Sequence, residues 1–554
     1  MQGKWIFRVL LVGVLLSGLV GCGRRFVLNE DEDIPEATIT PKVRYTPGAD
    51  AVGTVSQYAR ILDGTHMRVK GYGIVVGLGK NGSREVPAQL REYLVQQLLR
   101  QGIGIYSQGT GDISPSEVLN SLDTAVVTVT GAVPPQLPSG SSFDVIVTAS
   151  DATGTKTLDG GILMATDLRL DVGVELDPSY GSDIKGVACG SITLNPFVDP
   201  TDPQFAMRHR EGRIIGGGWL EKDRDVSLHM ISSNYAVSDK IAKRINSRFS
   251  GLGVDQVANA KSADLISLTI PPVYHDKPER FMELVLHLPL NDSPGAWETH
   301  MHHILDELAA PDAPCESLAL VIEAQGGQVL PMIKPYYTNE DERISFYTAR
   351  IGMRLGDRSA DSIIIDFAAE EGPFQILAIK SLGEHSKIGM ADRTLRKLVD
   401  SENTRVRIEA YRALRDRGST AVRQIHVGGM FYLDIVQASK GNDLIYATRV
   451  DECRIVLFGR DVEIKSPVFY MSSDSLVHIN GLPDAEQVQL RRTVPLTGRR
   501  SDKFEGPYEV KWLVETMGSS PRSSISGNID GLGLTYGQIV QTLYNLSEEK
   551  HVSA

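Results

Sequence analysis

Two short segments of the chain have residue types and spacing that could do chemistry. The first contains Gly77, Gly79 and Gly82 in the GxGxxG spacing with which a turn after a strand brings backbone N–H groups to a pyrophosphate. Residues 83–87 separate the last glycine from the next expected helix, whereas in a dinucleotide site the motif opens that helix. No acidic residue ends a second strand about 20 residues later, where the ribose would be held. The glycines therefore favour tight turns and close packing, and we expect no cofactor.

The second segment is rich in histidine. On a helix, His300, His303 and Glu307 would share one face and form a three-ligand donor set for a metal. However, the segment has no HExxH motif and borders ordinary helices, so a solvated helix face is the better interpretation. The chain also has no GxSxG nucleophile motif, and its carboxylates are scattered. We therefore predict no catalytic residue, no metal site and no enzymatic activity.

The N-terminus has the layout of a secretory signal. Lys4 and Arg8 precede an apolar stretch of residues 9–20, which at about 12 residues is shorter than the roughly 20 that span a bilayer. The ending at residues 19–22, Leu-Val-Gly-Cys, resembles a bacterial lipobox, which would make Cys22 a lipid-attachment residue. The alternative is an ordinary signal peptide with a chance cysteine. Either reading places the mature chain outside the cytoplasm.

Composition narrows the function further. The chain has 554 residues, 42% of them hydrophobic and 23% charged, which is typical of a globular protein of two to four domains. A net charge of −12 disfavours binding to nucleic acid. The other cysteines, Cys189, Cys315 and Cys453, are widely spaced, which excludes a disulfide scaffold and a cysteine zinc site. They leave room for one long-range disulfide, whose pairing the sequence does not decide.

Hydrophobic periodicity predicts an α+β chain with a helical interruption. Strands are expected at 74–76, 125–129, 143–147, 265–270, 454–458 and 476–479, and helices at 88–100, 238–249 and 535–549. Between about 296 and 425 only helices are expected. Similar segments begin at residues 343, 373 and 405, a period near 30 that is typical of helical-pair solenoids. The segment at 400–410 resembles the start of a HEAT repeat helix, and a plain helical bundle is the alternative.

The glycine-rich segment and several later ones resemble the family of flagellar P-ring proteins. The matching segments keep the family's order and spacing over about 55–290: residues 71–78, Pro134 and Pro135, Gly140, the strand at 143–147, and residues 158–168, 212–218 and 241–249. The resemblance resumes at residues 454–459 and 537–543. Two features depart from the family pattern. They are the lipoprotein-type signal and the helical block at 296–425.

The resemblance implies a multi-domain, β-rich, ring-forming subunit with an inserted all-α, HEAT-like block. We expect a signal peptide at 1–21, a lipid-anchored tether at 22–54, P-ring-like regions at 55–290 and 426–554, and the helical repeats at 291–425. Glycines at Gly71, Gly73, Gly77, Gly79, Gly160, Gly161, Gly216 and Gly217 are expected to serve backbone structure. The repeats are expected to fold nearly independently and to offer a concave surface to another envelope component.

The partners that the resemblance implies are further copies of the chain, rod and outer-membrane ring proteins, and peptidoglycan. The implied location is the periplasmic part of the flagellar basal body, where the ring is a bushing for the rotating rod. A lipid-anchored cell-envelope scaffold outside the flagellum is the second hypothesis, and a periplasmic enzyme is the third.

Overall fold

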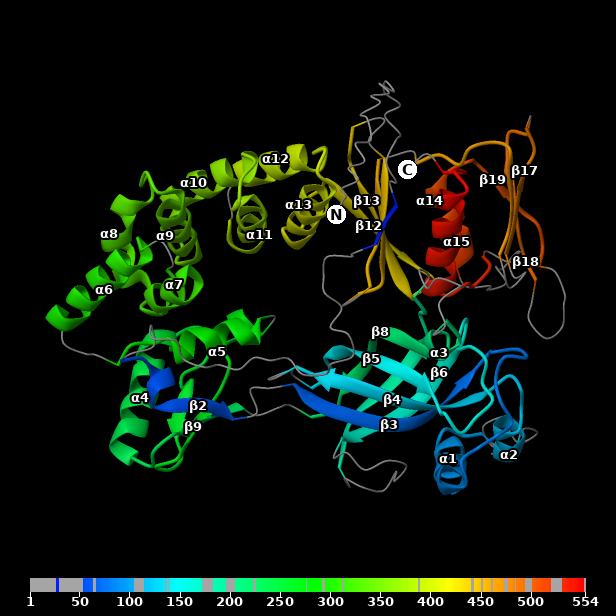
Figure 1. Cartoon of the computed structure of the whole chain (residues 1–554), viewed down its shortest axis with the longest axis horizontal. Coiled ribbons are helices and arrows are strands. Elements are labelled where there is room, and N and C mark those ends of the chain that lie inside the picture. The colour runs from blue at the N-terminus through cyan, green and yellow to red at the C-terminus, as the bar shows by residue number, and fades with distance from the viewer. Residues whose placement is uncertain are drawn as a thin grey trace, which may run out of the picture.

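The computed structural model shows β-rich units joined by a block of helices (Figure 1). It describes residues 26–28, 53–62, 66–103, 114–134, 137, 139–171, 183–195, 205–222, 226–275, 277–290, 294–310, 313–386, 389–439, 443–449, 452–459, 462–472, 477–483, 485–493, 501–519 and 531–552. Among these residues, no helix is both long and apolar enough to cross a bilayer. Residues 1–21, predicted as a signal peptide, and Cys22 lie outside the described residues.

Residues 66–220 contain a closed β-barrel with the strand order β3-β4-β5-β8-β7-β6. Its strands are β3 (Met67–Val76), β4 (Ala125–Val133), β5 (Ser142–Ala149), β6 (Ile162–Leu170), β7 (Ile184–Ser191) and β8 (Glu211–Leu220). Neighbouring strands are antiparallel. Alternate side chains point inward, and Val127, Val129, Val145 and Val147 are fully buried there.

Short helices cover one outer face of the barrel. Helix α1 (Ala88–Arg100) and α2 (Pro115–Leu119) pack on β3 and β4, and α3 (Phe205–Arg208) precedes β8. In α1, Leu90, Leu94 and Leu98 recur at helical spacing and are buried against Tyr72 and Ile74. The barrel wall is therefore apolar on both sides along this stretch of β3.

A smaller unit, the α/β unit (residues 53–62 and 226–290), lies beside the barrel (Figure 1). Its sheet has the order β10-β11-β9-β2, with β2 (Ala59–Leu62), β9 (Val226–Met230), β10 (Ala258–Ala260) and β11 (Leu265–Leu268). Helices α4 (Tyr235–Phe249) and α5 (Pro278–Leu286) cover one face of this sheet, and Phe249 and Phe281 are at the centre of the shared core. The barrel is thus inserted between β2 and β9.

The helical block comprises α6 (Pro294–Leu308), α7 (Cys315–Ala324), α8 (Leu330–Ile333), α9 (Glu342–Arg354), α10 (Arg358–Ala369), α11 (Gln375–His385), α12 (Gly389–Leu398) and α13 (Thr404–Asp416). The three segments that are similar in sequence lie at the starts of α9, α11 and α13. Asp341 caps α9 and Asn403 caps α13, since each side chain accepts backbone N–H groups of the first turn. Helices α10 and α12 alternate with the three similar helices.

The C-terminal unit (residues 421–552, with β1) contains two sheets with helices between them. The first has the order β1-β14-β15-β13-β12, with β1 (Phe26–Leu28), β12 (Val422–Val427), β13 (Phe431–Val436), β14 (Leu444–Ala447) and β15 (Arg454–Phe458). The second has the order β16-β17-β18-β19, with β16 (Val468–Met471), β17 (Val477–Gly481), β18 (Val488–Arg492) and β19 (Phe504–Gly506). Helices α14 (Val510–Gly518) and α15 (Tyr536–Glu548) share a core with both sheets.

The first C-terminal sheet is buried on both faces, and one of those faces belongs to the helical block. Along β14, Leu444 and Tyr446 face the helices, whereas Ile445 and Ala447 face α14 and α15. At the other end of the block, Leu320 and Ala324 of α7 are part of the core of the α/β unit. This sharing of cores disagrees with the expectation that residues 296–425 fold nearly independently.

Several predicted elements match the structure closely. Helix 88–100 and strand 454–458 are confirmed with the predicted bounds, and the terminal helix begins one residue after its cap Thr535. Strand 74–76 is only the end of β3, because the alternation before it is broken by Lys70, Gly71 and Gly73. A mixed α and β chain is confirmed, while the HEAT-like character of the block stays a prediction.

Candidate functional site

The glycines of β3 allow two strands of the barrel to approach closely. A Cβ atom at Gly71 would overlap the carbonyl oxygen of Asp167, and one at Gly73 would overlap the hydroxyl of Thr166. The register between β3 and β6 shifts between Lys70 and Val75, which brings the backbones together at this point. The two glycines therefore serve close packing and not a turn.

The turn after β3 does require glycine. Gly77 and Gly79 have φ angles of 86° and 66°, which residues with a Cβ rarely adopt. The Gly79 N–H donates to the carboxylate of Asp123 at 2.7 Å, and the Gly82 N–H donates to the carbonyl of Leu122 at 2.9 Å. The backbone donors that a pyrophosphate would need are thus used within the protein, which makes this loop a structural turn.

The remaining predicted glycines lie at two other turns of the barrel. Gly160 and Gly161 precede β6, and a Cβ at Gly161 would lie 2.8 Å from a Leu78 methyl carbon, inside contact distance. Gly216 and Gly217 form the irregular part of β8, where the Gly216 N–H donates to Asp144 at 2.7 Å. The structure places all eight glycines in the strands and turns of one barrel, which the sequence did not predict, and it sets Gly71 and Gly73 against β6.

The C-terminal unit contacts the barrel at one of these glycines, Gly160. A Cβ at Gly160 would lie 2.9 Å from the amide nitrogen of Gln538 in α15, and one at Gly537 would lie 3.3 Å from Thr193. Ile215 of β8 packs against the core of the C-terminal unit. The small residues therefore also shape the contact between units that are distant in sequence.

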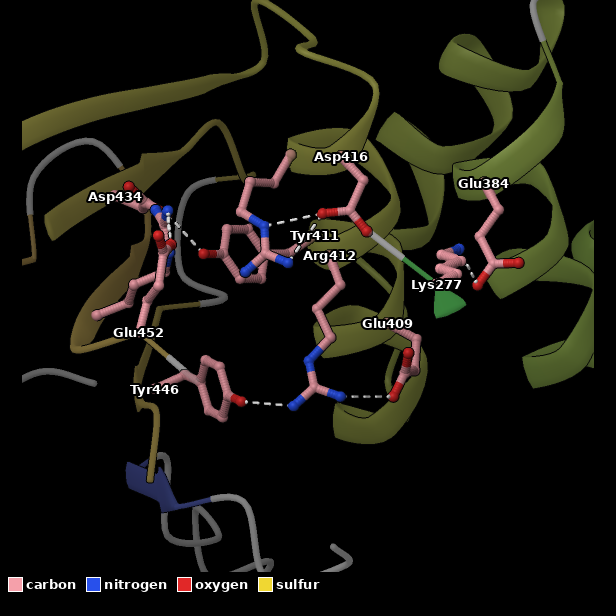
Figure 2. Close-up of polar contacts among 11 residues, drawn as sticks. Lys277, Glu384, Glu409, Tyr411, Arg412, Asp416, Asp434, Tyr446 and Glu452 are labelled. Carbon is pink, nitrogen blue, oxygen red and sulfur yellow. Dashed lines mark hydrogen bonds and ion pairs between the residues drawn. The ribbon is translucent and has the colours of Figure 1, made fainter. Parts of the chain in front are cut away.

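A buried polar network joins the helical block to the first C-terminal sheet (Figure 2). The hydroxyl of Tyr411 on α13 donates to the Asp434 carboxylate at 2.5 Å, and Arg454 donates to the same oxygen at 3.0 Å. The Asp434 side chain is fully buried. Burial raises the pKa of Tyr411 and the neighbouring Asp434 raises it further, so the phenol stays protonated as a donor. The network fixes α13 on β13 and β15.

A second contact lies beside the first. Arg412 of α13 bridges Glu409, at 3.2 Å, and the hydroxyl of Tyr446 on β14, at 2.9 Å (Figure 2). Because Glu409 is buried, its charge needs a partner, and Arg412 supplies one while also reaching the sheet. Sequence patterns did not identify these residues. The available signal was Asp434, an acidic residue in the otherwise apolar strand β13.

The other end of the block is held to the α/β unit by ion pairs. Glu323 of α7 lies between Arg280 of α5, which it contacts directly, and Arg354 of α9, at 3.2 Å. The Nε of Arg248 donates to the carbonyl of Ala324 at 2.8 Å. These contacts reach from α4 and α5 to α7 and α9.

A further ion pair connects Lys277, just before α5, with Glu384 of α11 at 2.7 Å (Figure 2). Burial alone would raise the pKa of Glu384, but hydrogen bonds and charges from His385 and Lys277 outweigh it and lower the pKa to about 2. Glu384 is therefore ionised at any physiological pH, and the contact is a permanent ion pair there.

The histidine segment lies on α6. His303 Nε2 is 3.1 Å from Glu307, and both side chains are largely exposed. Within the described ranges, no group of three His, Cys, Asp or Glu side chains is arranged to hold a metal ion. The geometry is that of an exposed helix-surface pair one turn apart.

The three described cysteines are unpaired. Cys189, Cys315 and Cys453 are free thiols, so the structure contains no disulfide among them. Burial raises the pKa of Cys453 to about 12, and the negative charges of Asp144 and Glu452 act in the same direction. A thiol with so high a pKa is a poor nucleophile.

Comparisons with known proteins bear on the barrel and the α/β unit. The family model described as flagellar P-ring protein matches residues 55–296. The flagellar P-ring protein of Nitratidesulfovibrio vulgaris is 27% identical over 239 residues, which cover 41% of this chain and 57% of that protein. The corresponding protein of Geotalea uraniireducens is 29% identical over 222 residues, 38% of this chain and 54% of the relative.

The flagellar P-ring protein of Caulobacter vibrioides is 30% identical over 213 residues, which cover 36% of this chain and 51% of that protein. The chain thus spans about half the length of the curated relatives it matches. The matched residues end within the first turn of α6, so α7–α13 lie beyond them. Over residues 55–296, the barrel and the α/β unit together, the chain is similar to the flagellar P-ring proteins.

Proposed function

We propose that the chain is a structural subunit of the flagellar P ring, in the periplasmic part of the basal body. The match over residues 55–296 carries this proposal, because it covers the barrel and the α/β unit as one continuous region. The packing supports it. Small residues are used to bring strands and whole units together, which suits a protein whose function lies in its interfaces.

The partners follow from that role. Further copies of the chain would complete the ring, rod and outer-membrane ring proteins would contact its inner and upper surfaces, and peptidoglycan would surround it. Lipidation at Cys22 would add a membrane anchor. Several acyl chains hold firmly because each buried methylene contributes about 0.8 kcal/mol.

The helical block would act as a brace inside the subunit. Its α7 end is fixed to the α/β unit through Glu323, and its α13 end is fixed to the C-terminal sheet through Asp434. The C-terminal unit also contacts the barrel, and the barrel is inserted in the α/β unit. The α/β unit, the helical block, the C-terminal unit and the barrel therefore form a closed loop of contacts. A brace of this kind would hold the α/β unit and the C-terminal unit at a constant separation.

Electron microscopy of isolated basal bodies tests the main proposal. Gold labelling of an epitope-tagged chain should mark the periplasmic ring, and loss of the gene should abolish motility while leaving the inner-membrane rings in place. Label distributed over the envelope of cells with the tagged chain, together with normal motility of cells that lack the gene, would instead support a scaffold outside the flagellum. Mass spectrometry of the mature N-terminus tests the lipid: an unmodified N-terminus downstream of Cys22 would rule it out.

A further inference from the structure

Two patches of exposed apolar side chains lie on different units of the molecule. The first, patch A, consists of Tyr58, Ile231 and Tyr235, which are 37%, 54% and 59% exposed. The Ile231 N–H donates to the carbonyl of Tyr58 at 2.8 Å, and Tyr235 begins α4 four residues later. Patch A therefore sits beside β2, at the edge of the sheet in the α/β unit.

The second, patch B, consists of Phe469, Met471 and Leu482, which are 59%, 59% and 51% exposed. Phe469 pairs with Asn480 across β16 and β17, so Leu482, two residues beyond Asn480, is on the same face. The alternate residues of β16 are buried, with Val468 at 0% and Tyr470 at 5% exposure. The exposure of patch B is thus set by the register of a well-packed strand.

Patch B also lies on a sheet edge. In the described part of the sheet, β16 is the outermost strand. The Ser472 N–H donates to the carbonyl of Val477 at 3.0 Å, and antiparallel pairing alternates, so the backbone groups of Phe469 and Met471 point away from β17. An edge with exposed apolar side chains and no charged residue on that face of the strand is a template for association.

The patches lie at opposite ends of the molecule. In Figure 1 the longest axis is horizontal, with β2, β9 and α4 at the left and β17 and β18 at the right. Identical subunits form a closed ring only through a heterologous contact, in which two different surfaces of the subunit meet. Two apolar patches at opposite ends meet that requirement, whereas a single patch would give a twofold dimer.

We propose that patch A of one copy binds patch B of the next, as the apolar anchor of a head-to-tail contact between subunits. This inference rests on the proposed ring function and names the surfaces that would form the ring. The occupant of each patch is therefore a second copy of this chain. Exposed aromatic and long apolar residues are the residue types that carry most of the free energy at such contacts.

The test uses the full chain, purified in a mild detergent, with two double variants. I231D/Y235D alters patch A and F469D/M471D alters patch B. Each variant should stay monomeric at concentrations where the unmodified chain assembles, because each change removes an apolar anchor and lowers affinity by about tenfold or more. The matched control is M207D/M390D, which makes the same kind of change at positions 71% and 55% exposed outside both patches.

Mixing the two variants decides the geometry. The I231D/Y235D variant keeps patch B, and the F469D/M471D variant keeps patch A. One copy of each variant can therefore pair through the intact patches, and mass photometry should show one-to-one dimers and no longer species. Variants that still assemble like the control, or a mixture that stays monomeric, would overturn the proposed contact. An unmodified chain that never self-associates would instead count against the ring function itself. Equal melting temperatures for all three double variants would show that folding is unaffected.

Discussion

The strands of the barrel and the two ends of the helical block are fixed by different kinds of contact. In the barrel, glycines let strands approach until a single Cβ would overlap backbone atoms, and the interior contains valine and leucine. At the two ends of the helical block the contacts are buried charges: Glu323 of α7 at one end and, at the other, Asp434 of the adjoining strand β13. Close packing of the barrel strands thus requires glycines, which have no Cβ atom. The attachment of the helical block at its two ends requires specific buried charges.

This difference predicts different weaknesses. A packing seam resists pH and salt but fails when an atom is added, because interiors are close-packed. A buried charge network tolerates changes in volume but fails when one partner is removed, because the other charge is left uncompensated. Substitutions that add an atom in the barrel, or remove a charge at an end of the helical block, therefore test which kind of contact stabilises each region.

The largest effect is expected from removing the block. Deletion of residues 296–420, which ends before β12 and is bridged by a short Gly/Ser linker, would expose the face of the C-terminal sheet that contains Tyr446, Val456 and Phe458. We expect aggregation and loss of the cooperative thermal transition, measured by circular dichroism and light scattering. A soluble, folded product would show that the brace is dispensable and would restore the original expectation of an independent insertion.

Next in size is the removal of a buried charge at the C-terminal end of the block. Asp434→Ala leaves the Arg454 guanidinium and the Tyr411 hydroxyl without their shared acceptor. We expect a loss of about 3–5 kcal/mol in the free energy of unfolding, measured by urea denaturation. The control is Asp392→Ala, an ion-pair carboxylate nearer the surface, which should cost about 1 kcal/mol or less. Equal losses would remove the special role of the network.

A smaller loss is expected in the barrel. Gly71→Ala adds a methyl group against the Asp167 backbone and should cost about 1–3 kcal/mol by overpacking. Gly372→Ala, where a Cβ meets nothing within 4 Å, is the matched control and should be neutral or slightly stabilising. The comparison is made by thermal denaturation. A Gly71→Ala variant as stable as the control would mean that β3 and β6 can move apart freely.

The sequence was sufficient for elements with strong periodicity and insufficient for contacts between units. Helix 88–100 could be predicted because Leu90, Leu94 and Leu98 repeat at helical spacing, and strand 454–458 because residues 455–458 are a continuous apolar run. The glycines could be assigned to backbone structure. Their partners could not, because which strand lies against Gly71 depends on barrel closure, a property of residues about 100 positions away.

The contact between α13 and the first C-terminal sheet could not be predicted either, because it too depends on residues that are distant in sequence. A solenoid normally packs against its own repeats, and for that reason the sequence predicts a block that folds nearly independently. In the structure, the first C-terminal sheet takes the position after α13, and Tyr411 and Arg412 contact strands instead. Nothing in the local pattern of α13 distinguishes a helix neighbour from a sheet neighbour.

The smallest effect concerns the ion pair between Lys277 and Glu384. The pKa of Glu384 is lowered to about 2 in the folded chain, from an ordinary value of 4.5. A lowered folded-state pKa stabilises the protein above the unfolded-state pKa, and that contribution disappears as the pH falls toward 2. Because the pair is partly exposed, Glu384→Gln should cost at most about 1 kcal/mol at pH 7.

The measurement is the difference in unfolding free energy between the unmodified chain and Glu384→Gln, taken at intervals from pH 7 to pH 3. The difference should be constant above about pH 5 and should shrink steadily below pH 4.5. Lys277→Gln should give a smaller loss at pH 7, because Glu384 keeps its contact with His385, and the double variant should lose no more than Glu384→Gln alone. A pH-independent difference would mean that Glu384 stabilises α11 by packing, and that its ion pair with Lys277 contributes nothing to the contact between the block and the α/β unit.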